Sequence, residues 1–263
     1  MHVAEQDRLR EVAVGAALAA GQLLRHHFGR PQQVEHKGEI DLVTALDRQA
    51  EATIVERIRA VFPDHAVLAE EDTWGDARGE HRWVIDPLDG TTNYAHGYPV
   101  FCVSVAYEHA GHVVLGVVYD PLREELFLGE AGGGASLNGR PLRVSATANL
   151  RESLLITGFP YDRAQFPHVV RLLGALLDRS QGVRRSGAAA LDLCYVAAGR
   201  ADGYWERFVR PWDVAAGTLI VAAAGGRVTD FRGGPFDVHC GEAVATNGTI
   251  HDELLGGLAA AGG

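Results

Sequence analysis

The segment Asp86-Pro-Leu-Asp-Gly-Thr-Thr-Asn93 gathers residue types that could do chemistry together. It follows the apolar run 83–85, which predicts a short strand. An ordinary turn needs one Asp and one Gly, so a second carboxylate and two threonines indicate more than a turn. Across such a turn Asp86 and Asp89 could both point inward with the Leu88 carbonyl group, as in a shared metal site. The backbone N–H groups of residues 90–92 could cradle a phosphate.

Two further acidic clusters stand at the ends of expected elements. Glu70-Glu71-Asp72 follows the apolar run 66–69, and Asp213 opens an apolar helix. Taken alone, the first would be a solvated loop and the second a helix cap. Acids that project from strand ends tend to converge, and their mutual repulsion then calls for cations. Oxygen ligands without His or Cys favour Mg²⁺ over zinc.

The elements that would position these acids follow from hydrophobic spacing. Helices are expected over 45–62, 168–178, 188–198, 213–224 and 252–260, and strands over 66–69, 83–85, 154–157, 202–205 and 227–230. An antiparallel meander is expected over 100–107, 113–119 and 125–128. This order predicts a layered α/β fold with helices between sheets. We expect one catalytic domain over 1–263, with approximate lobes 1–145 and 146–263.

Composition excludes several classes of function. The 263 residues carry 34 acids against 24 bases, a formal net charge of −10, which does not favour a nucleic-acid partner. Cys102, Cys194 and Cys240 are odd in number and scattered, so we expect buried free thiols and a cytoplasmic protein. Polar residues interrupt the apolar part of residues 1–28, which predicts an amphipathic helix and no membrane span.

The chain resembles the inositol monophosphatase family, the lithium-sensitive, magnesium-dependent sugar-phosphate phosphatases, over essentially its whole length. The resemblance is carried by five motifs in family order: Asp41-Leu-Val-Thr44-Ala-Leu-Asp47, Glu70-Glu71, the segment 86–93, Gly187-Ala-Ala-Ala190 and Trp212-Asp-Val-Ala-Ala-Gly217. It implies alternating helix and sheet layers of the inositol monophosphatase/fructose-1,6-bisphosphatase type. By analogy it also implies a homodimer.

The resemblance assigns roles residue by residue. Glu70, Asp86 and the Leu88 carbonyl oxygen would hold one Mg²⁺. Asp86, Asp89 and Asp213 would hold a second, and a third would share Glu70 and waters. The substrate would meet, besides Asp89, the residues Gly90, Thr91, Gly187, Ala188, Ala189, Glu206 and Arg210. Asp47, hydrogen-bonded to Thr91, would orient or deprotonate the attacking water, so Asp47, Glu70 and Thr91 are the expected catalytic residues.

Two departures bear on the substrate. Ala188 stands where mammalian members usually have threonine. Arg210, before Pro211-Trp-Asp213, resembles bacterial and archaeal members, some of which also accept fructose 1,6-bisphosphate. The resemblance therefore implies a Mg²⁺-dependent phosphomonoesterase that hydrolyses inositol 1-phosphate or a similar small polyol or sugar phosphate with a metal-activated water. The alternatives are a fructose 1,6-bisphosphatase, a histidinol-phosphate phosphatase or, from another class, a regulatory binding module with a protein or RNA partner.

Overall fold

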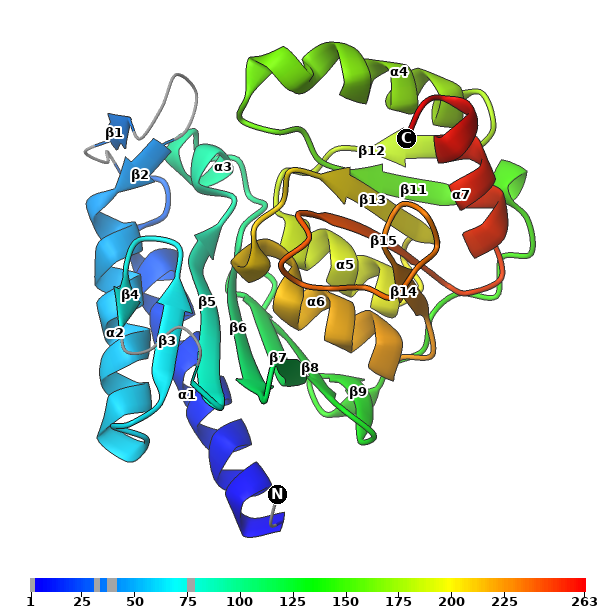
Figure 1. Ribbon diagram of the computed structural model, residues 1–263. Coiled ribbons are helices and arrows are strands. Elements are labelled where there is room, and N and C mark those ends of the chain that lie inside the picture. Colours follow the sequence, from blue (N-terminus) through cyan, green and yellow to red (C-terminus); the bar gives the residue numbers. More distant parts are fainter. Residues whose placement is uncertain (1–2, 31–33, 37–41, 75–78) are drawn as a thin grey trace.

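The computed structural model describes residues 3–30, 34–36, 42–74 and 79–263. Within them, helices and sheets alternate in five layers, which Figure 1 shows from α1 and α2 on one side to α4 and α7 on the other. The expected layered α/β fold is thereby confirmed. None of the described helices is both long and apolar enough to cross a membrane.

The larger sheet has eight strands in the order β10-β9-β8-β7-β6-β5-β3-β4. It is antiparallel apart from the parallel pair β3 and β5. Its strands are β3 (Ala66–Ala69), β4 (Thr73–Trp74), β5 (His81–Asp89), β6 (Cys102–His109), β7 (His112–Asp120), β8 (Glu125–Glu130), β9 (Gly134–Leu137) and β10 (Arg140–Pro141). A separate ribbon pairs β1 (Val34–His36) with β2 (Leu42–Thr44).

The smaller sheet has five strands in the order β12-β11-β13-β15-β14. They are β11 (Leu154–Thr157), β12 (Gly182–Arg184), β13 (Gly203–Arg207), β14 (Arg227–Thr229) and β15 (Glu242–Thr246). The strand β11 runs parallel to β12 and β13, whereas β15 is antiparallel to β13 and β14.

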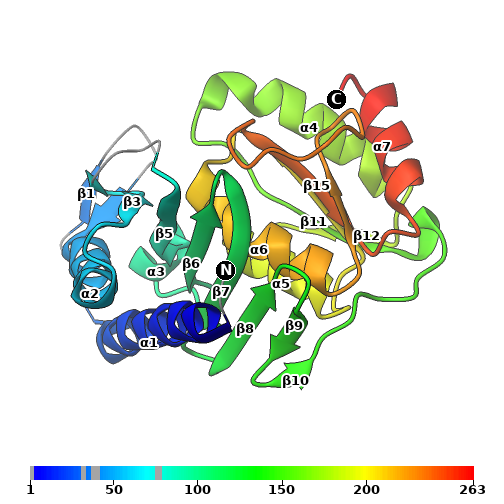
Figure 2. The same cartoon turned by 60° about the horizontal axis from the view of Figure 1, so that its bottom comes forward.

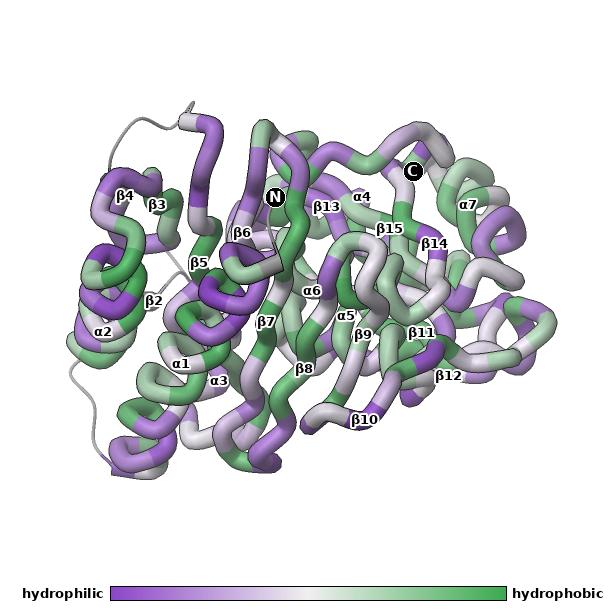
Figure 3. Tube along the Cα trace, turned by 90° about the horizontal axis from the view of Figure 1, so that it is seen from below, coloured by the Kyte–Doolittle hydropathy of each residue, from purple (hydrophilic) through white to green (hydrophobic). Residues whose placement is uncertain are grey.

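The described helices are α1 (Val3–His27), α2 (Ala45–Val61), α3 (Thr91–Ala95), α4 (Phe166–Leu177), α5 (Ala189–Ala197), α6 (Pro211–Ala223) and α7 (His251–Ala260). The first two cover the outer face of the larger sheet, α5 and α6 fill the space between the sheets, and α4 and α7 cover the smaller sheet (Figure 2). Hydrophilic and hydrophobic turns alternate along the outer helix α2, whereas the central helix α5 is mostly hydrophobic (Figure 3). This is the pattern that one-sided and two-sided burial require.

Helix α6 packs closely against the larger sheet because glycines face it. A Cβ on Gly116 of β7 would lie 2.8 Å from the Ala216 carbonyl oxygen, and one on Gly129 of β8 would lie 2.9 Å from the Ile220 Cα. On its other side, a Cβ on Gly217 would lie 2.6 Å from the Leu193 Cβ of α5. The missing side chains let the helix backbone rest on its neighbours, which fixes the position of its first turn.

Several expected elements need correction. The strand expected over 83–85 continues to Asp89. Among the described strands, those not expected are β1, β2, β4, β9, β10, β12 and β15. The residues of β15, Glu242-Ala-Val-Ala-Thr246, include two alanines, which are poor strand formers, yet residues 243–246 are buried between two other strands. Among the thiols, Cys102 and Cys194 are buried as expected, but Cys240 is exposed.

Candidate active site

Strand β5 brings the two acids of the central motif to its carboxyl end. Asp86 pairs with Ser104 of β6 and Asp89 pairs with Cys102, so three steps along β5 match two along β6. In a regular strand, residues three apart face opposite sides. The extra residue is a β-bulge, which returns Asp89 to the face of Asp86. The sequence predicted a turn between the two acids, and the structure replaces it with this bulged strand, in which Pro87 needs no ladder hydrogen bond.

The third acid enters from the first turn of α6. Asp213 is the third residue of that helix, and its Oδ2 accepts a hydrogen bond of 2.7 Å from the Arg210 backbone N–H. Ser104 of β6 donates to the Trp212 carbonyl oxygen at 3.3 Å, which ties this helix start to the strand beside Asp86. Glu70, directly after β3, completes the acidic set.

These carboxylates are held where charge is costly. Asp86 is 3% exposed and Asp89 is 7% exposed. Burial, together with the charges of Glu70, Asp89 and Asp213, raises the pKa of Asp86 well above its usual range. Burial likewise raises the pKa of Asp213 and brings that of Asp89 to about 6, although backbone N–H donors oppose the rise. A cation among the four would remove this penalty.

A cavity of about 820 Å³ opens onto the acids. Its near wall is formed by Glu70, Asp86, Leu88, Asp89, Gly90, Thr91, Trp212 and Asp213, and its far wall by residues 160–162, 207–210 and 240–242. The far wall includes Tyr161 and Phe208, two exposed aromatic side chains. Of this wall only Arg210 was expected from the sequence, because the rest comes from strand ends and loops of the second sheet that carry no motif. Phe208 also has a φ of 67°, a left-handed conformation rare for a bulky residue.

Helix α2 contributes a buried acceptor behind Thr91. The Thr91 hydroxyl lies 3.1 Å from Asp47 Oδ1 and 3.0 Å from the Leu88 carbonyl oxygen, so its one proton can reach either acceptor. Asp47 is fully buried. The contact expected between Asp47 and Thr91 is therefore present. Asp41, in the same motif, lies outside the described residues.

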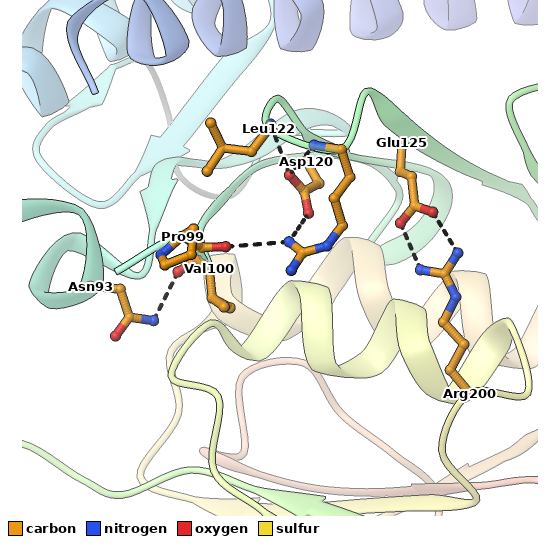
Figure 4. A network of polar contacts seen from close by, with 8 residues as sticks. Asn93, Pro99, Val100, Asp120, Leu122, Glu125 and Arg200 are labelled. Atoms are coloured by element: carbon orange, nitrogen blue, oxygen red, sulfur yellow. Dashed lines mark hydrogen bonds and ion pairs between the residues drawn. The ribbon is translucent and has the colours of Figure 1, made fainter. Parts of the chain in front are cut away.

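A glycine and an asparagine shape the turn into α3. Gly90 has φ of 95°, and a Cβ there would lie 3.0 Å from the Val100 carbonyl oxygen, so glycine suits both the angle and the space. The Asn93 side chain donates to the carbonyl oxygens of Val100 and Ser186, each at 2.8 Å. Figure 4 shows the first of these contacts. Beside it, the Arg123 side chain donates a hydrogen bond of 3.3 Å to the Pro99 carbonyl oxygen. The segment behind the cavity is thus pinned on both sides.

Asp89 also caps a helix from a distance. Its carboxylate accepts the backbone N–H groups of Ala189 at 3.1 Å and Ala190 at 2.8 Å, at the start of α5. The Ala188 side chain that precedes them offers no capping oxygen. Gly187, Ala188 and Ala189 therefore lie behind Asp89, and they do not belong to the lining of the 820 Å³ cavity in the described chain.

Arg210 and Glu206 were both expected to contact the substrate, and the structure places them differently relative to the cavity. Arg210 is exposed and lines the cavity, whereas Glu206 does not. The Glu206 carboxylate accepts a hydrogen bond of 2.7 Å from the Tyr204 hydroxyl and sits over Gly158, where a Cβ would collide with it. Burial raises the pKa of Glu206 to about 7, partly opposed by the Tyr204 hydrogen bond and the charge of Arg185.

Known proteins are similar to this chain over almost its whole length. The model of the Inositol monophosphatase family matches residues 5–261. An inositol-1-monophosphatase of Synechocystis is 51% identical over 257 residues, covering 95% of this chain and 88% of that protein. The Nus factor SuhB of Escherichia coli strain K12 is 44% identical over 253 residues and covers 94% of each. A solved inositol monophosphatase structure from Anabaena (Nostoc) is 47% identical, covers 97% of both chains and superposes with a TM-score of 0.90.

Proposed function

Because the chain belongs to the inositol monophosphatase family, we propose that it is a Mg²⁺-dependent phosphomonoesterase acting on inositol 1-phosphate or a similar small polyol or sugar phosphate. The observation that supports this most is the meeting of Glu70, Asp86, Asp89 and Asp213 at one cavity. The cavity volume of about 820 Å³ lies in the range of small-molecule sites.

The donor set fits a hard cation. All the candidate ligand atoms are oxygens, from four carboxylates and the Leu88 carbonyl group, which is the chemistry that Mg²⁺ prefers. The first ion would be held by Glu70, Asp86 and Leu88, and the second by Asp86, Asp89 and Asp213. The Leu88 carbonyl oxygen keeps a lone pair beside its hydrogen bond from Thr91. Asp89 Oδ2 already accepts the Ala190 N–H and the Cys102 thiol, so Oδ1 is the candidate ligand atom of Asp89. When bound, the cations would supply the positive charge that offsets the phosphate and the developing charge on the leaving oxygen.

The chain's own groups would orient the attacking water. With its proton directed at Asp47, the Thr91 hydroxyl oxygen can accept a hydrogen bond from a water in the cavity. Asp47 would then take the proton that this water loses through Thr91, a general-base role at the correct distance. The left-handed turn at Gly90 leaves no side chain between the backbone and the phosphate.

Although Glu206 does not line the described cavity, it remains our candidate for recognition of the polyol. A carboxylate accepts hydrogen bonds from hydroxyl groups and repels a second phosphate, whereas the planar fork of Arg210 suits a second phosphate. With a pKa of about 7, Glu206 would be charged above neutral pH. The two residues therefore separate the inositol 1-phosphate reading from the fructose 1,6-bisphosphate alternative.

Phosphate release across a panel of substrates tests the proposal. The panel holds inositol 1-phosphate, glycerol 2-phosphate, fructose 1,6-bisphosphate, histidinol phosphate and adenosine 3′,5′-bisphosphate, each with Mg²⁺ and with chelator. We expect Asp89→Asn to lower activity at least roughly a hundredfold, as for other lost transition-state charge contacts. The matched control is Asp178→Asn, an exposed position at the end of α4. Activity of Asp89→Asn within about threefold of the control would refute the ligand role.

The name of the Escherichia coli relative favours a second candidate, a regulatory binding role beside catalysis. The net charge of −10 points to a protein partner more than to RNA. A pull-down of RNA polymerase components with wild type and Asp89→Asn would separate the two roles. Retained binding by the inactive variant would support a second role, and absence of binding by wild type would remove it.

Three further expectations remain predictions: a single catalytic domain, a homodimer and a cytoplasmic location. A single cooperative calorimetric transition would support the first. Light scattering after size-exclusion chromatography would test the second, and fractionation of cells that produce the protein would test the third.

A further inference from the structure

Two histidines face each other at the opposite end of β5 from the acids. His81 and His109 are register partners in the antiparallel pair of β5 and β6. Their rings stack with centroids 5.1 Å apart and an interplanar angle of 26°. Glu80 directly precedes β5, and its carbonyl oxygen accepts a hydrogen bond of 2.8 Å from the Ala110 N–H. Its carboxylate Oε1 lies 3.8 Å from His109 Nε2. One ligand atom from each of the three residues lies within 4.8 Å of the others.

We propose that Glu80, His81 and His109 form a second metal site, which binds a first-row divalent transition ion such as Zn²⁺. Two imidazoles and one carboxylate are a mixed nitrogen and oxygen donor set, which zinc accepts and magnesium does not favour. His81 and Asp86 are five residue steps apart along β5, or about 16 Å at the usual rise of a strand. The two sites are therefore separate in both position and chemistry.

His81 is already oriented as a ligand. Its Nδ1 lies 2.5 Å from the Tyr107 hydroxyl oxygen. The phenol oxygen can accept the Nδ1–H at this distance. That tautomer leaves the Nε2 lone pair free for a metal, the usual arrangement of ligating histidines. His65 stacks on the His81 ring at 4.7 Å and 8°, and its own Nδ1 accepts a hydrogen bond from Trp83 at 3.2 Å. These contacts hold the ring in place.

His109 has unmet hydrogen-bonding capacity. Its Nδ1 is buried and has no hydrogen-bond partner in the described part of the chain. Its Nε2 is too far from Glu80 for a hydrogen bond at 3.8 Å. An ion shared with Glu80 and His81 would provide a partner for Nε2, the ring nitrogen that faces Glu80.

An ion can reach this cluster from a neighbouring cavity. The cavity has a volume of about 540 Å³, and His109 and Tyr107 line it together with Asp7, Arg10 and Glu130. Arg10 forms ion pairs with both Asp7 and Glu130. The arginine therefore occupies the two carboxylates that would otherwise compete for the ion, while the cavity supplies an open path to His109.

The test titrates the full chain with Zn²⁺ by calorimetry and with Co²⁺ by visible absorption, in millimolar Mg²⁺ that fills the carboxylate site. We expect one equivalent bound, with the absorption bands of a cobalt–imidazole complex. Because loss of an outer contact alone weakens metal binding about 10- to 100-fold, Glu80→Gln and His109→Ala should each weaken it at least about tenfold. Glu80 is exposed, so Glu80→Gln should fold normally, and circular dichroism checks this.

A nearby histidine provides the matched control. His112 is exposed, lies in the same β6–β7 hairpin and is not part of the cluster. His112→Ala should bind Zn²⁺ like wild type. Three results would overturn the proposal: no Zn²⁺ bound above the Mg²⁺-saturated background, equal affinity in wild type and Glu80→Gln, or a loss in His112→Ala as large as that in His109→Ala. The phosphatase assay plays no part in this test, so its outcome is independent of the proposed function.

Discussion

Removing the cations should destabilise the whole protein, and Asp213→Asn should cancel that dependence. Without metal, the buried carboxylates of Asp86 and Asp213 are kept near each other and near Glu70, and their raised pKa values record the cost. Bound Mg²⁺ would stabilise the folded chain over the unfolded one by mass action. The asparagine removes one ligand charge, yet its side-chain oxygen can still accept the Arg210 N–H that caps α6.

The size of the effect follows from the chain length. An ion at 100 times its dissociation constant adds about 2.7 kcal/mol to the free energy of unfolding. At about 2.1 cal/mol/K per residue, unfolding of the 263-residue chain has an entropy of roughly 0.55 kcal/mol/K. Saturating Mg²⁺ should therefore raise the melting temperature of wild type by about 5 °C. In Asp213→Asn the rise should fall below about 2 °C, and the metal-free variant should melt no lower than metal-free wild type.

Differential scanning calorimetry in chelator and in Mg²⁺ measures both quantities, with Asp178→Asn as the control for loss of one charge. The direction in which the Mg²⁺-induced shift changes with pH can also be predicted. In the metal-free protein the pKa of Asp89 is about 6, above the unfolded value of 3.8. Protonation of Asp89 in the folded state therefore contributes stability to the metal-free protein as pH falls through 6. These protons compete with Mg²⁺, so the metal-induced shift should be full at pH 8 and shrink below about 6. A full shift in Asp213→Asn, or none in wild type, would refute the reasoning.

Three further predictions concern single side chains. Thr91→Ala should lower kcat for phosphate release at least about a hundredfold, while Thr92→Ala stays within about threefold of wild type; similar losses in both would contradict the role of the Thr91 hydroxyl. Glu206→Gln should raise KM for inositol 1-phosphate above pH 7, where the carboxylate is charged, whereas Arg210→Ala should affect only fructose 1,6-bisphosphate; steady-state kinetics on both substrates decide. The buried ring of His251 has its pKa lowered to about 4, so this residue alone should lower the free energy of unfolding by up to about 3 kcal/mol as pH falls from 6.5 to 4. Urea unfolding across that range should show a flatter profile for His251→Asn.

The sequence was informative about the near wall of the cavity. The acids at 70, 86, 89 and 213 were expected to converge from their places at element ends, and they line one cavity. The pairing of Asp47 with Thr91 is also present. The local sequence pattern around each of these acids predicts the strand or helix to which it belongs. The fold then brings three ends together: those of β3 and β5 and the start of α6.

Features that depend on long-range packing were not predicted. The bulge in β5 is invisible in the sequence, because Pro87 and Gly90 look like turn residues and only the register with β6 shows a continuous strand. Tyr161 and Phe208 reach the cavity because the second sheet faces the first, which no local pattern records. Cys240 was expected to be buried, but its loop lies at the rim of the cavity and leaves it exposed.

Because α6 packs closely through glycines, the four acids should lie in regions of the backbone that unfold locally at different rates. Because α6 rests on the backbone of β7 and β8 near Gly116 and Gly129, its amide hydrogens should exchange with solvent only when the whole molecule unfolds. Asp213 and the end of β5 belong to this slowly exchanging region. Glu70 instead follows the short strand β3 near the edge of the sheet, where local opening needs less free energy. The proposed second cation site is thus preorganised by the core, while the proposed first site has one ligand that could move without the rest.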